Sequence, residues 1–490
     1  MTNGRNILSI LIILSIAFLS YFNTFTNSFH FDDYTYILKN EGLKEYFQHP
    51  FSFSFILSNL HHRSIVFATL FLNHSLDGFN VFGFHILNLT VHIITCLLIF
   101  LIAKEILSIN LFLKTSDQSK IKLNIPLISA LLFAVHPINT QAITYITGRT
   151  TSLAVCFYMA SFLFFIKGII QNLPCKILFY ALSIVFLILG FGSKIIILTA
   201  PVMFIVYYLF FTPLKATFFK RFFECKFIRI IIQTIVITSP FILIFMSNHL
   251  NLKDIHSFMV DWAFPLVSSG ARVTKKGFEF LEILRPFLGK LIQIGSMDNL
   301  GISIYLLTEF KVIVFYYIKM IFFPFNQNID PDFPVAHGIT DAGVALSLGV
   351  IVLCLFAGIY FYKKNRLIAF GIFWFFITLL PTSSVLPLRD TITEHRLYLP
   401  LAGFILTIPL YLNQFIIRYK KSSFKQLTYF ILPVFLLIIV FSTLTVKRNF
   451  VWKDEKSLWS DAAEKSPRLS RPLNNLAEAY DKEGLAYGNQ

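Results

Sequence analysis

Long apolar runs recur along almost the whole chain, and they constrain its fold more than any other feature. Eleven runs are long enough, or nearly so, to cross the roughly 30 Å hydrocarbon layer of a bilayer as helices. Hydrophobic residues make up 56% of the 490 residues and charged residues 14%, which excludes an ordinary water-soluble protein. We therefore predict an all-α polytopic membrane protein with about eleven transmembrane helices. The runs lie near 7–25, 83–103, 125–137, 152–166, 177–192, 195–211, 230–247, 343–361, 367–386, 400–417 and 427–446.

Charge on the short loops predicts the orientation. With the N-terminus in the cytoplasm, the cytoplasmic stretches hold 19 of the 42 Lys and Arg residues but only three of the 26 Asp and Glu residues. Because positive charge collects on short cytoplasmic loops, this pattern predicts an N-in, C-out topology. The net charge of +16 is then largely an insertion signal, and we expect no nucleic-acid partner. The cytoplasmic stretches begin with Arg5 and continue with 104–124, 167–176, 212–229, 362–366 and 418–425.

Two stretches between the spans predict helices at the external membrane surface. Residues 278–294 are apolar at helical spacing with charged residues interleaved, which is typical of an interfacial helix. Residues 310–325 are also apolar, but Lys311 and Lys319 interrupt them. Because a lysine at mid-depth is costly, we expect an interfacial or re-entrant segment rather than a span. The long external segments are loops 26–82 and 248–342 of a membrane domain 1–446, followed by a polar tail, 447–490.

The tail carries the start of a repeat. Leu473, Leu476, Ala477, Tyr480 and Gly484 have the spacing of the first helix of a tetratricopeptide repeat. One incomplete repeat cannot bury its own apolar face. We therefore expect a helical tail that either packs on the membrane domain or requires further repeats.

Two adjacent carboxylates, Asp32 and Asp33, follow the first span in a predicted external loop. A carboxylate near a hydroxyl can act as a general base, or it can hold a divalent cation that neutralises a phosphate leaving group. Adjacent positions favour one working Asp with one supporting Asp over two acids acting on one target. A solvated turn or a helix N-cap before Tyr34 is the structural alternative.

Polar side chains also follow one face of the second span. His85, Asn88 and His92 are spaced i, i+3 and i+7, so they share one helical face. Polar groups inside a span face a cavity or a partner helix, so substrate contact and helix-to-helix hydrogen bonding are both open interpretations. Two histidines without a third ligand do not make a metal site.

Several basic residues occupy short external loops, where the positive-inside rule disfavours them. A phosphate at the headgroup level would compensate, because Arg binds it with two parallel hydrogen bonds and Lys as a point charge. Simple pairing, for instance of Arg396 with Glu394 or with a lipid phosphate, is the alternative. The polar residues of these loops are His136, Arg149, Lys194, Arg389, Glu394, His395, Arg396 and Tyr398.

Taken in order, these motifs resemble the transmembrane and tetratricopeptide-repeat O-mannosyltransferase family over nearly the whole chain. The resemblance implies a GT-C glycosyltransferase fold, a catalytic Asp in the first external loop and a polyprenyl-phosphate sugar as donor. In that family the donor is dolichyl-phosphate mannose and the acceptor is Ser or Thr of a protein, and bacterial relatives are expected to use undecaprenyl-phosphate sugars. The matching stretches are Phe31-Asp32-Asp33, Arg63-Ser64 with Asn73, Gly83-Phe84-His85 with Asn88 and His92, His136-Pro137, Gly148-Arg149, Ser193-Lys194, Glu394-His395-Arg396-Leu397-Tyr398 and the closing repeat.

The chain departs from the family pattern at three positions. Relatives commonly have Glu after the Ser-Lys pair and Glu after the His-Pro pair, where this chain has Ile195 and Gln141. Ser64 also replaces the usual Pro after Arg63. If the missing carboxylates hold Lys194 or a cation in relatives, this chain must achieve that otherwise. We therefore assign no metal, keep a divalent cation at Asp32 and Asp33 as an alternative, and leave the sugar open. The five cysteines have no metal-ligand or C-x-x-C spacing, so we expect neither a zinc site nor a disulfide framework.

The leading hypothesis is therefore inverting transfer of mannose or another hexose on the external face. Asp33, supported by Asp32, would deprotonate the acceptor hydroxyl, which attacks the anomeric carbon of the donor. The predicted partners are a polyprenyl-phosphate sugar, a protein or glycan acceptor and the bilayer. The donor phosphate would bind Arg149, Lys194, Arg396, Arg389 and Arg63, while the remaining substrate contacts would come from His85, Asn88, His136, Glu394, His395 and Tyr398.

Two other classes of protein stay open at this point. A non-enzymatic scaffold would recruit partners through the tail 447–490. A transporter would use the polar residues within spans, although transporter sites are expected near the midplane and these residues gather on the external side. The chain has no glycine-rich nucleotide-binding motif. For the enzyme we expect a bacterial cytoplasmic membrane, or the endoplasmic reticulum membrane in a eukaryote, with the active site and C-terminus on the external or luminal side.

Overall fold

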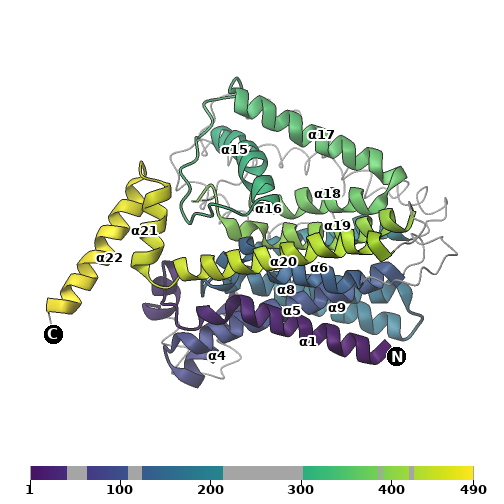
Figure 1. The fold of residues 1–490 in the computed structure, drawn as a ribbon, viewed down its shortest axis with the longest axis horizontal. Coiled ribbons are helices and arrows are strands. Elements are labelled where there is room, and N and C mark those ends of the chain that lie inside the picture. Colours follow the sequence, from purple (N-terminus) through teal and green to yellow (C-terminus); the bar gives the residue numbers. More distant parts are fainter. Residues whose placement is uncertain are drawn as a thin grey trace, which may run out of the picture.

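A computed structural model describes residues 2–40, 63–108, 124–212, 302–384, 388, 390–418 and 424–488. Every regular element in these ranges is a helix, which confirms the predicted all-α polytopic class. Most of the long helices run side by side as a bundle (Figure 1). The N-terminus lies at one end of the bundle, and a C-terminal helical hairpin projects from the other end (Figure 1).

Six helices in the described part are long and apolar enough to cross a membrane, or seven if a pair bent by 51° counts as one span. Three shorter apolar helices occupy three more of the predicted runs, so ten of the eleven runs are helical. The eleventh, 230–247, and the predicted interfacial helix 278–294 lie outside the described residues. The spans are Gly4–Thr24, Val81–Ser108, Arg149–Ile170, Ala342–Lys364, Glu394–Leu412, Ile431–Val451 and the bent pair Ile125–Ala134 with Pro137–Ile143, and the shorter helices are Cys175–Phe191, Ile195–Phe211 and Arg366–Leu379.

The bend in the pair has a local cause. Pro137 lacks an N–H and pushes the preceding residue out of the helical region, and His136 is indeed extended, with φ −68° and ψ 123°. His136 Nδ1 accepts from the N–H of Ile138 (3.3 Å) and caps the 3₁₀ turn that follows. The elements of the N-terminal half are α1 (Thr2–Tyr21), η1 (Phe22–Thr24), η2 (Tyr34–Leu38), α4 (Ser64–Asp77), α5 (Val81–Ser108), α6 (Ile125–Ala134), η3 (Pro137–Asn139), α7 (Thr140–Ile143), α8 (Arg149–Ile170), α9 (Cys175–Phe191), η4 (Ile195–Thr199) and α10 (Ala200–Phe211).

The predicted surface segment 310–325 is helical through Phe322 and is not among the candidate spans. Lys311 is buried, and its ammonium pairs with the carboxylate of Asp341 (3.0 Å), whereas Lys319 is exposed. The elements of the C-terminal half are α15 (Ile302–Lys311), η5 (Val312–Ile318), α16 (Lys319–Phe322), α17 (Ala342–Lys364), α18 (Arg366–Leu379), η6 (Glu394–Leu397), α19 (Tyr398–Arg418), α20 (Phe424–Val451), α21 (Glu455–Lys465) and α22 (Ser470–Gly488).

The centre of the bundle is packed with aromatic rings. Phe162 of α8 contacts Phe204 and Tyr207 of α10 and Trp374 of α18, with ring centroids 6.0, 5.3 and 5.3 Å away. Such offset and edge-to-face pairs add to the dispersion energy of close-packed rings. They fix the helices whose ends carry the loops described below.

Gly403 of α19 allows a close approach between two helices. A Cβ at this position would overlap the indole ring of Trp374, which is fully buried and cannot move aside. Gly403→Ala is therefore expected to lower the free energy of unfolding by about 1–3 kcal/mol, as overpacking does. Gly349→Ala in α17 is the matched control, because its Cβ would meet no atom within 4 Å. Thermal denaturation in detergent should show a lower Tm for the first variant and an unchanged or higher Tm for the second.

The tail forms a hairpin of α21 and α22. The predicted repeat residues 473–484 lie in α22. Pro472 and Ala479 are buried, whereas Leu473 and Tyr480 are 47% and 51% exposed. By contrast, α21 is anchored to the membrane helices, because Arg448 at the end of α20 pairs with Asp461 (2.8 Å). The tail therefore packs on the membrane domain through α21.

Candidate functional site

Asp33 lies buried beneath the first loop. One of its carboxylate oxygens accepts from the N–H of His30 (2.9 Å) and the other from the N–H of Thr147 (2.8 Å). Burial penalises the charged form and raises the pKa of Asp33 to about 7, although both backbone donors oppose the shift. The side chain does not cap η2. Asp33 thus joins the first loop to the loop before α8.

Asp32 is exposed, in contrast to its neighbour. Its main-chain N–H donates to the hydroxyl of Tyr145 (3.0 Å). The preceding residue, Phe31, has φ 44°, a left-handed conformation that is strained for a residue with a large side chain. The ring of Phe31 packs 4.7 Å from that of Trp459 in α21. Contacts with the tail therefore hold the strained residue that presents Asp32.

Four of the predicted substrate-binding residues hold the helices together. His85, Asn88, His136 and Tyr398 are all buried, as is His92. Their bonds join helices to one another or to the loops beside them, which favours the structural interpretation of these polar positions. The bonds join His85 Nε2 to Asn27 O (3.0 Å), Asn88 Nδ2 to Ile143 O (2.9 Å), His92 Nδ1 to the Tyr398 hydroxyl (2.7 Å) and His136 Nε2 to Ile321 O (3.0 Å).

Arg149, predicted to bind the donor phosphate, is fully buried. All three of its side-chain nitrogens donate to neutral oxygens among the described residues. This arrangement ties α4, α5 and α8 together, and we assign Arg149 a structural role. The acceptors are Asn88 Oδ1 (2.6 Å), Asn73 Oδ1 (2.7 Å), Phe84 O (2.9 Å), Thr69 O (3.2 Å) and Thr69 Oγ1 (3.3 Å).

Other predicted cations converge between η4, α4 and η6. Lys194 is half-buried, and its ammonium donates to the hydroxyl of Thr151 (2.7 Å). Burial, together with the charges of Arg63 and Arg396, lowers the pKa of Lys194 to about 7. Burial, together with the charges of the same three residues, lowers the pKa of His395 well below its usual value. We call Arg63, Lys194, His395 and Arg396 the cation cluster.

Two buried atoms of the cation cluster are suited to contact an anion. Among the described residues, neither Arg63 Nε nor His395 Nδ1 has a hydrogen-bond partner, although both atoms are buried. Arg63 also has φ 80°, another left-handed conformation of a non-glycine residue. Buried polar atoms are normally hydrogen-bonded, so unpartnered ones require an explanation such as a ligand. An anion among these side chains would supply the acceptors.

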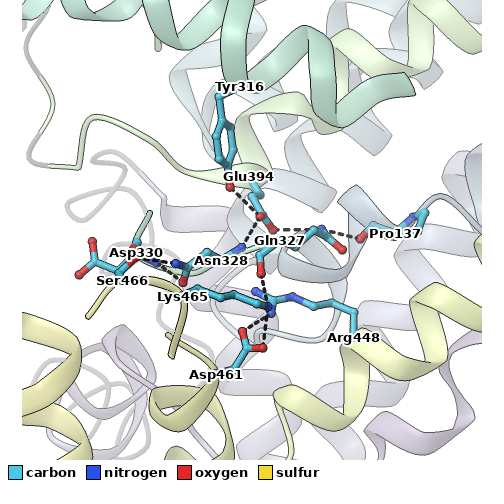
Figure 2. A network of polar contacts seen from close by, with 10 residues as sticks. All are labelled: Pro137, Tyr316, Gln327, Asn328, Asp330, Glu394, Arg448, Asp461, Lys465 and Ser466. Carbon is cyan, nitrogen blue, oxygen red and sulfur yellow. Dashed lines mark hydrogen bonds and ion pairs between the residues drawn. The ribbon is translucent and has the colours of Figure 1, made fainter. Parts of the chain in front are cut away.

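The carboxylates near the cation cluster do not form the ion pair that the sequence suggested as an alternative. Pairing of Arg396 with Glu394 is wrong, because Arg396 pairs with Glu309 of α15 (3.1 Å). Glu394 instead accepts three hydrogen bonds, which Figure 2 shows. They come from the hydroxyl of Tyr316 (3.0 Å), Gln327 Nε2 (3.0 Å) and the N–H of Asn328 (2.8 Å). Nothing in the isolated sequence marked Glu309, Tyr316 or Asn328.

One segment of the chain brings the Asp pair and the cation cluster together. Within residues 141–151, Thr147 binds Asp33 through its N–H, and Thr151 accepts from Lys194. Gln141 Oε1 accepts from the main-chain N–H of His395 (2.7 Å). The Asp pair and the cation cluster are therefore both bonded to residues of this one short segment, at the end of the bundle that carries the tail.

The other predicted site features are quickly placed. Arg389 lies outside the described residues. In the part of the chain that the structure describes, no group of three or more His, Cys, Asp or Glu side chains is arranged to hold a metal ion. Both oxygens of Asp33 accept N–H groups, so the cation alternative at Asp32 and Asp33 stays a prediction that the donor set does not favour.

Comparison with known proteins gives relatives for nearly the full chain. The Protein O-mannosyl-transferase F38B6.6 of Caenorhabditis elegans is 23% identical over 498 residues, covering 98% of this chain and 61% of the relative. The human Protein O-mannosyl-transferase TMTC3 is 22% identical over 503 residues, covering 98% and 50%. The chain is a homologue of the O-mannosyltransferases. It spans about half to three-fifths of the length of these two relatives. No family model and no solved structure matches the chain.

Neutral oxygens contact two residues of the cation cluster at positions where the sequence-based resemblance led us to expect neighbouring carboxylates. Gln141 uses its side-chain oxygen to hold the main-chain N–H of His395. Lys194 donates to the hydroxyl of Thr151. Neither contact offsets a positive charge of the cluster with a carboxylate.

Proposed function

We propose that the protein is a membrane glycosyltransferase that moves a hexose from a polyprenyl-phosphate donor to an acceptor hydroxyl, with inversion. The observation that carries this proposal is the cation cluster. Glu309 balances Arg396, but Lys194 is bonded only to a neutral hydroxyl and Arg63 Nε is unpartnered among the described residues. The phosphate of the donor would balance them. Its negative charge grows as it leaves, so cations fixed in place lower the barrier to transfer.

The exposure of the two carboxylates favours Asp32 as the general base. A base must reach the acceptor hydroxyl, and Asp32 is exposed whereas Asp33 is buried with both oxygens bonded. This reverses the roles in the sequence-based hypothesis, which gave the base role to Asp33. We propose that Asp33 instead positions the loop by holding it to Thr147.

The proposed step balances as a single displacement. The acceptor O–H gives its proton to the Asp32 carboxylate while its oxygen forms a bond to the anomeric carbon of the hexose. The bond from that carbon to the phosphate oxygen breaks on the opposite face, and the polyprenyl phosphate leaves with both bonding electrons. Inversion follows from the opposed directions of attack and departure.

The names of the relatives support a protein acceptor. Both proteins that match 98% of this chain are called protein O-mannosyl-transferases, so we propose a Ser or Thr hydroxyl of a protein as acceptor and mannose as the first hexose to test. The charges of the loops support a site on the external or luminal side of the membrane.

A transfer assay on the purified protein in lipid nanodiscs tests the function directly. The donors are polyprenyl-phosphate hexoses with labelled sugar, and the acceptors are Ser- and Thr-rich peptides. We expect label on the peptide, with an anomeric configuration opposite to that of the donor. Folded protein that leaves every lipid donor intact would contradict the proposal, and retention of configuration would overturn the single displacement.

The pKa of Lys194 predicts how donor affinity depends on pH. Lys194 is charged below about pH 7 and loses its proton above that value, while the phosphodiester of the donor stays ionised. The KM for the donor is therefore expected to be lowest below pH 7 and to rise, at most about tenfold per pH unit, toward pH 9. Lys194→Arg keeps the charge and should give a flat profile. A wild-type KM that does not change between about pH 6 and pH 9 would contradict this role.

A further inference from the structure

We propose that Ser466 of the tail is a positioning residue for the transfer reaction, which makes the α21–α22 hairpin part of the donor side of the site. This inference rests on the proposed function. Ser466 lies in the turn between α21 and α22 and is fully buried. Its hydroxyl accepts from Asn328 Nδ2 (2.8 Å) and from the N–H of Asp332 (3.0 Å), and it donates to the carbonyl of Asp330 (2.7 Å). One donor and two acceptor positions use the whole capacity of a hydroxyl.

The segment that follows α16 connects the tail to Glu394 through two neighbouring residues (Figure 2). Asn328 donates its side-chain amide to Ser466 and its main-chain N–H to Glu394 (2.8 Å). Gln327 donates Nε2 to Glu394 (3.0 Å), and its carbonyl accepts from the ammonium of Lys465 in α21 (2.8 Å). The preceding Asn326 has φ 57°. A left-handed non-glycine residue costs energy, and these contacts hold it in place.

Glu394 transmits this anchoring to the cation cluster. It begins η6, and the next two residues are His395 and Arg396. Glu394 is buried and accepts through both oxygens, so the position of η6 depends on the donors of Gln327, Asn328 and Tyr316. Displacing a catalytic group by about 1 Å can cost about 100-fold in rate. A tail that loosens its hold on Asn328 therefore disturbs the groups that would bind the donor phosphate.

The same hairpin contacts the loop that carries Asp32 and Asp33. Trp459 of α21 packs on Phe31, the residue before Asp32. His30 Nε2 bonds to the carbonyl of Trp452 (2.8 Å), just before α21. The hairpin thus contacts the loop that carries Asp32 and Asp33. Through Ser466 and Asn328 it is also bonded to Glu394 of η6. The hairpin therefore fixes the loop of Asp32 and Asp33 relative to the cation cluster.

Ser466→Ala and Asn328→Ala test this role in the full-length protein. Both variants remove the hydrogen bond between Asn328 and Ser466, while Ser466→Ala also removes the bonds to Asp330 O and Asp332 N–H and Asn328→Ala the bond from Asp330 N–H. We expect each to raise the KM for the polyprenyl-phosphate hexose at least fivefold and to leave the KM for the peptide within twofold. A double-mutant cycle should show that the two changes are not additive. Arg468→Ala is the matched control, because Arg468 pairs with Asp332 nearby but is 83% exposed, and it should keep both constants.

The kinetic pattern separates positioning from stability. A variant that is merely less stable has a smaller active fraction, which lowers the apparent kcat but leaves both KM values unchanged. Ser466→Ala and Asn328→Ala with unchanged donor KM, or with additive effects, would overturn the inference. Failure of the wild-type protein to transfer from any polyprenyl-phosphate donor would instead overturn the proposed function, so the two failures are distinguishable.

Discussion

Replacing Asp32 by Asn is expected to lower kcat by about 10²–10⁴-fold, which is the usual contribution of a positioned general base. The side chain is exposed, so the substitution should leave the fold intact. The KM for the donor should change little, because the cation cluster that would bind the phosphate is untouched. Single-turnover transfer from a labelled polyprenyl-phosphate hexose in nanodiscs measures the chemical step directly.

Two further variants make this result specific to Asp32. Glu464→Gln removes another exposed carboxylate, in α21, and should retain full activity. In Asp33→Asn an amide NH₂ replaces one of the two acceptor oxygens, so one of the two backbone N–H groups loses its partner. This variant should therefore lower the amount of folded protein more than the activity of each folded molecule. Full activity of Asp32→Asn, combined with an inert but folded Asp33→Asn, would return the base role to Asp33.

Lys194→Ala is expected to lower kcat/KM for the donor by about 10²–10³-fold, the typical cost of removing one group that stabilises developing negative charge. Lys194 donates to a neutral hydroxyl and pairs with no carboxylate among the described residues, so its removal leaves none of their acids without a partner. The loss should therefore appear in transfer and not in stability. Donor titrations at a fixed peptide concentration give kcat/KM for each variant.

The control for this prediction is a lysine at the same end of the bundle. Lys447, near the end of α20, is exposed, and Lys447→Ala should keep wild-type kinetics. Lys194→Arg should restore part of the activity, since it keeps the charge but changes the shape of the donor group. An equal loss in Lys447→Ala and Lys194→Ala would mean that overall surface charge attracts the donor and that no specific phosphate contact exists.

The helices were largely predictable, because a span in lipid must be a continuous apolar stretch and such stretches can be read directly from the chain. Helix lengths were harder to predict. The run 125–137 ends early at the break before Pro137, and the run 195–211 begins with a 3₁₀ turn, η4, instead of an α-helix. Local backbone preferences at a few residues decide such boundaries, whereas hydropathy averages over many.

The candidate site was predictable in its charges but not in its partners. Lys194 and Arg396 stand out because cations on short external loops need compensation, and Asp32 stands out because it adjoins a second carboxylate in the first external loop. The partner of Arg396 is Glu309, 87 residues away, and that of Ser466 is Asn328, 138 residues away. No periodicity in one sequence carries information about pairs so distant. The sequence likewise did not show that the guanidinium of Arg149 is buried among neutral oxygens.

The bonds between the first loop and the beginning of the tail set the order of assembly during synthesis. His30 and Trp452 are separated by 422 residues. At about 5–20 residues per second, a ribosome needs roughly 20–80 s to make the chain between them. During that time the loop that carries Asp32 and Asp33 lacks the contacts with the tail that hold it. The nascent protein therefore gains the complete candidate site only after α20 and the start of the tail have been synthesised.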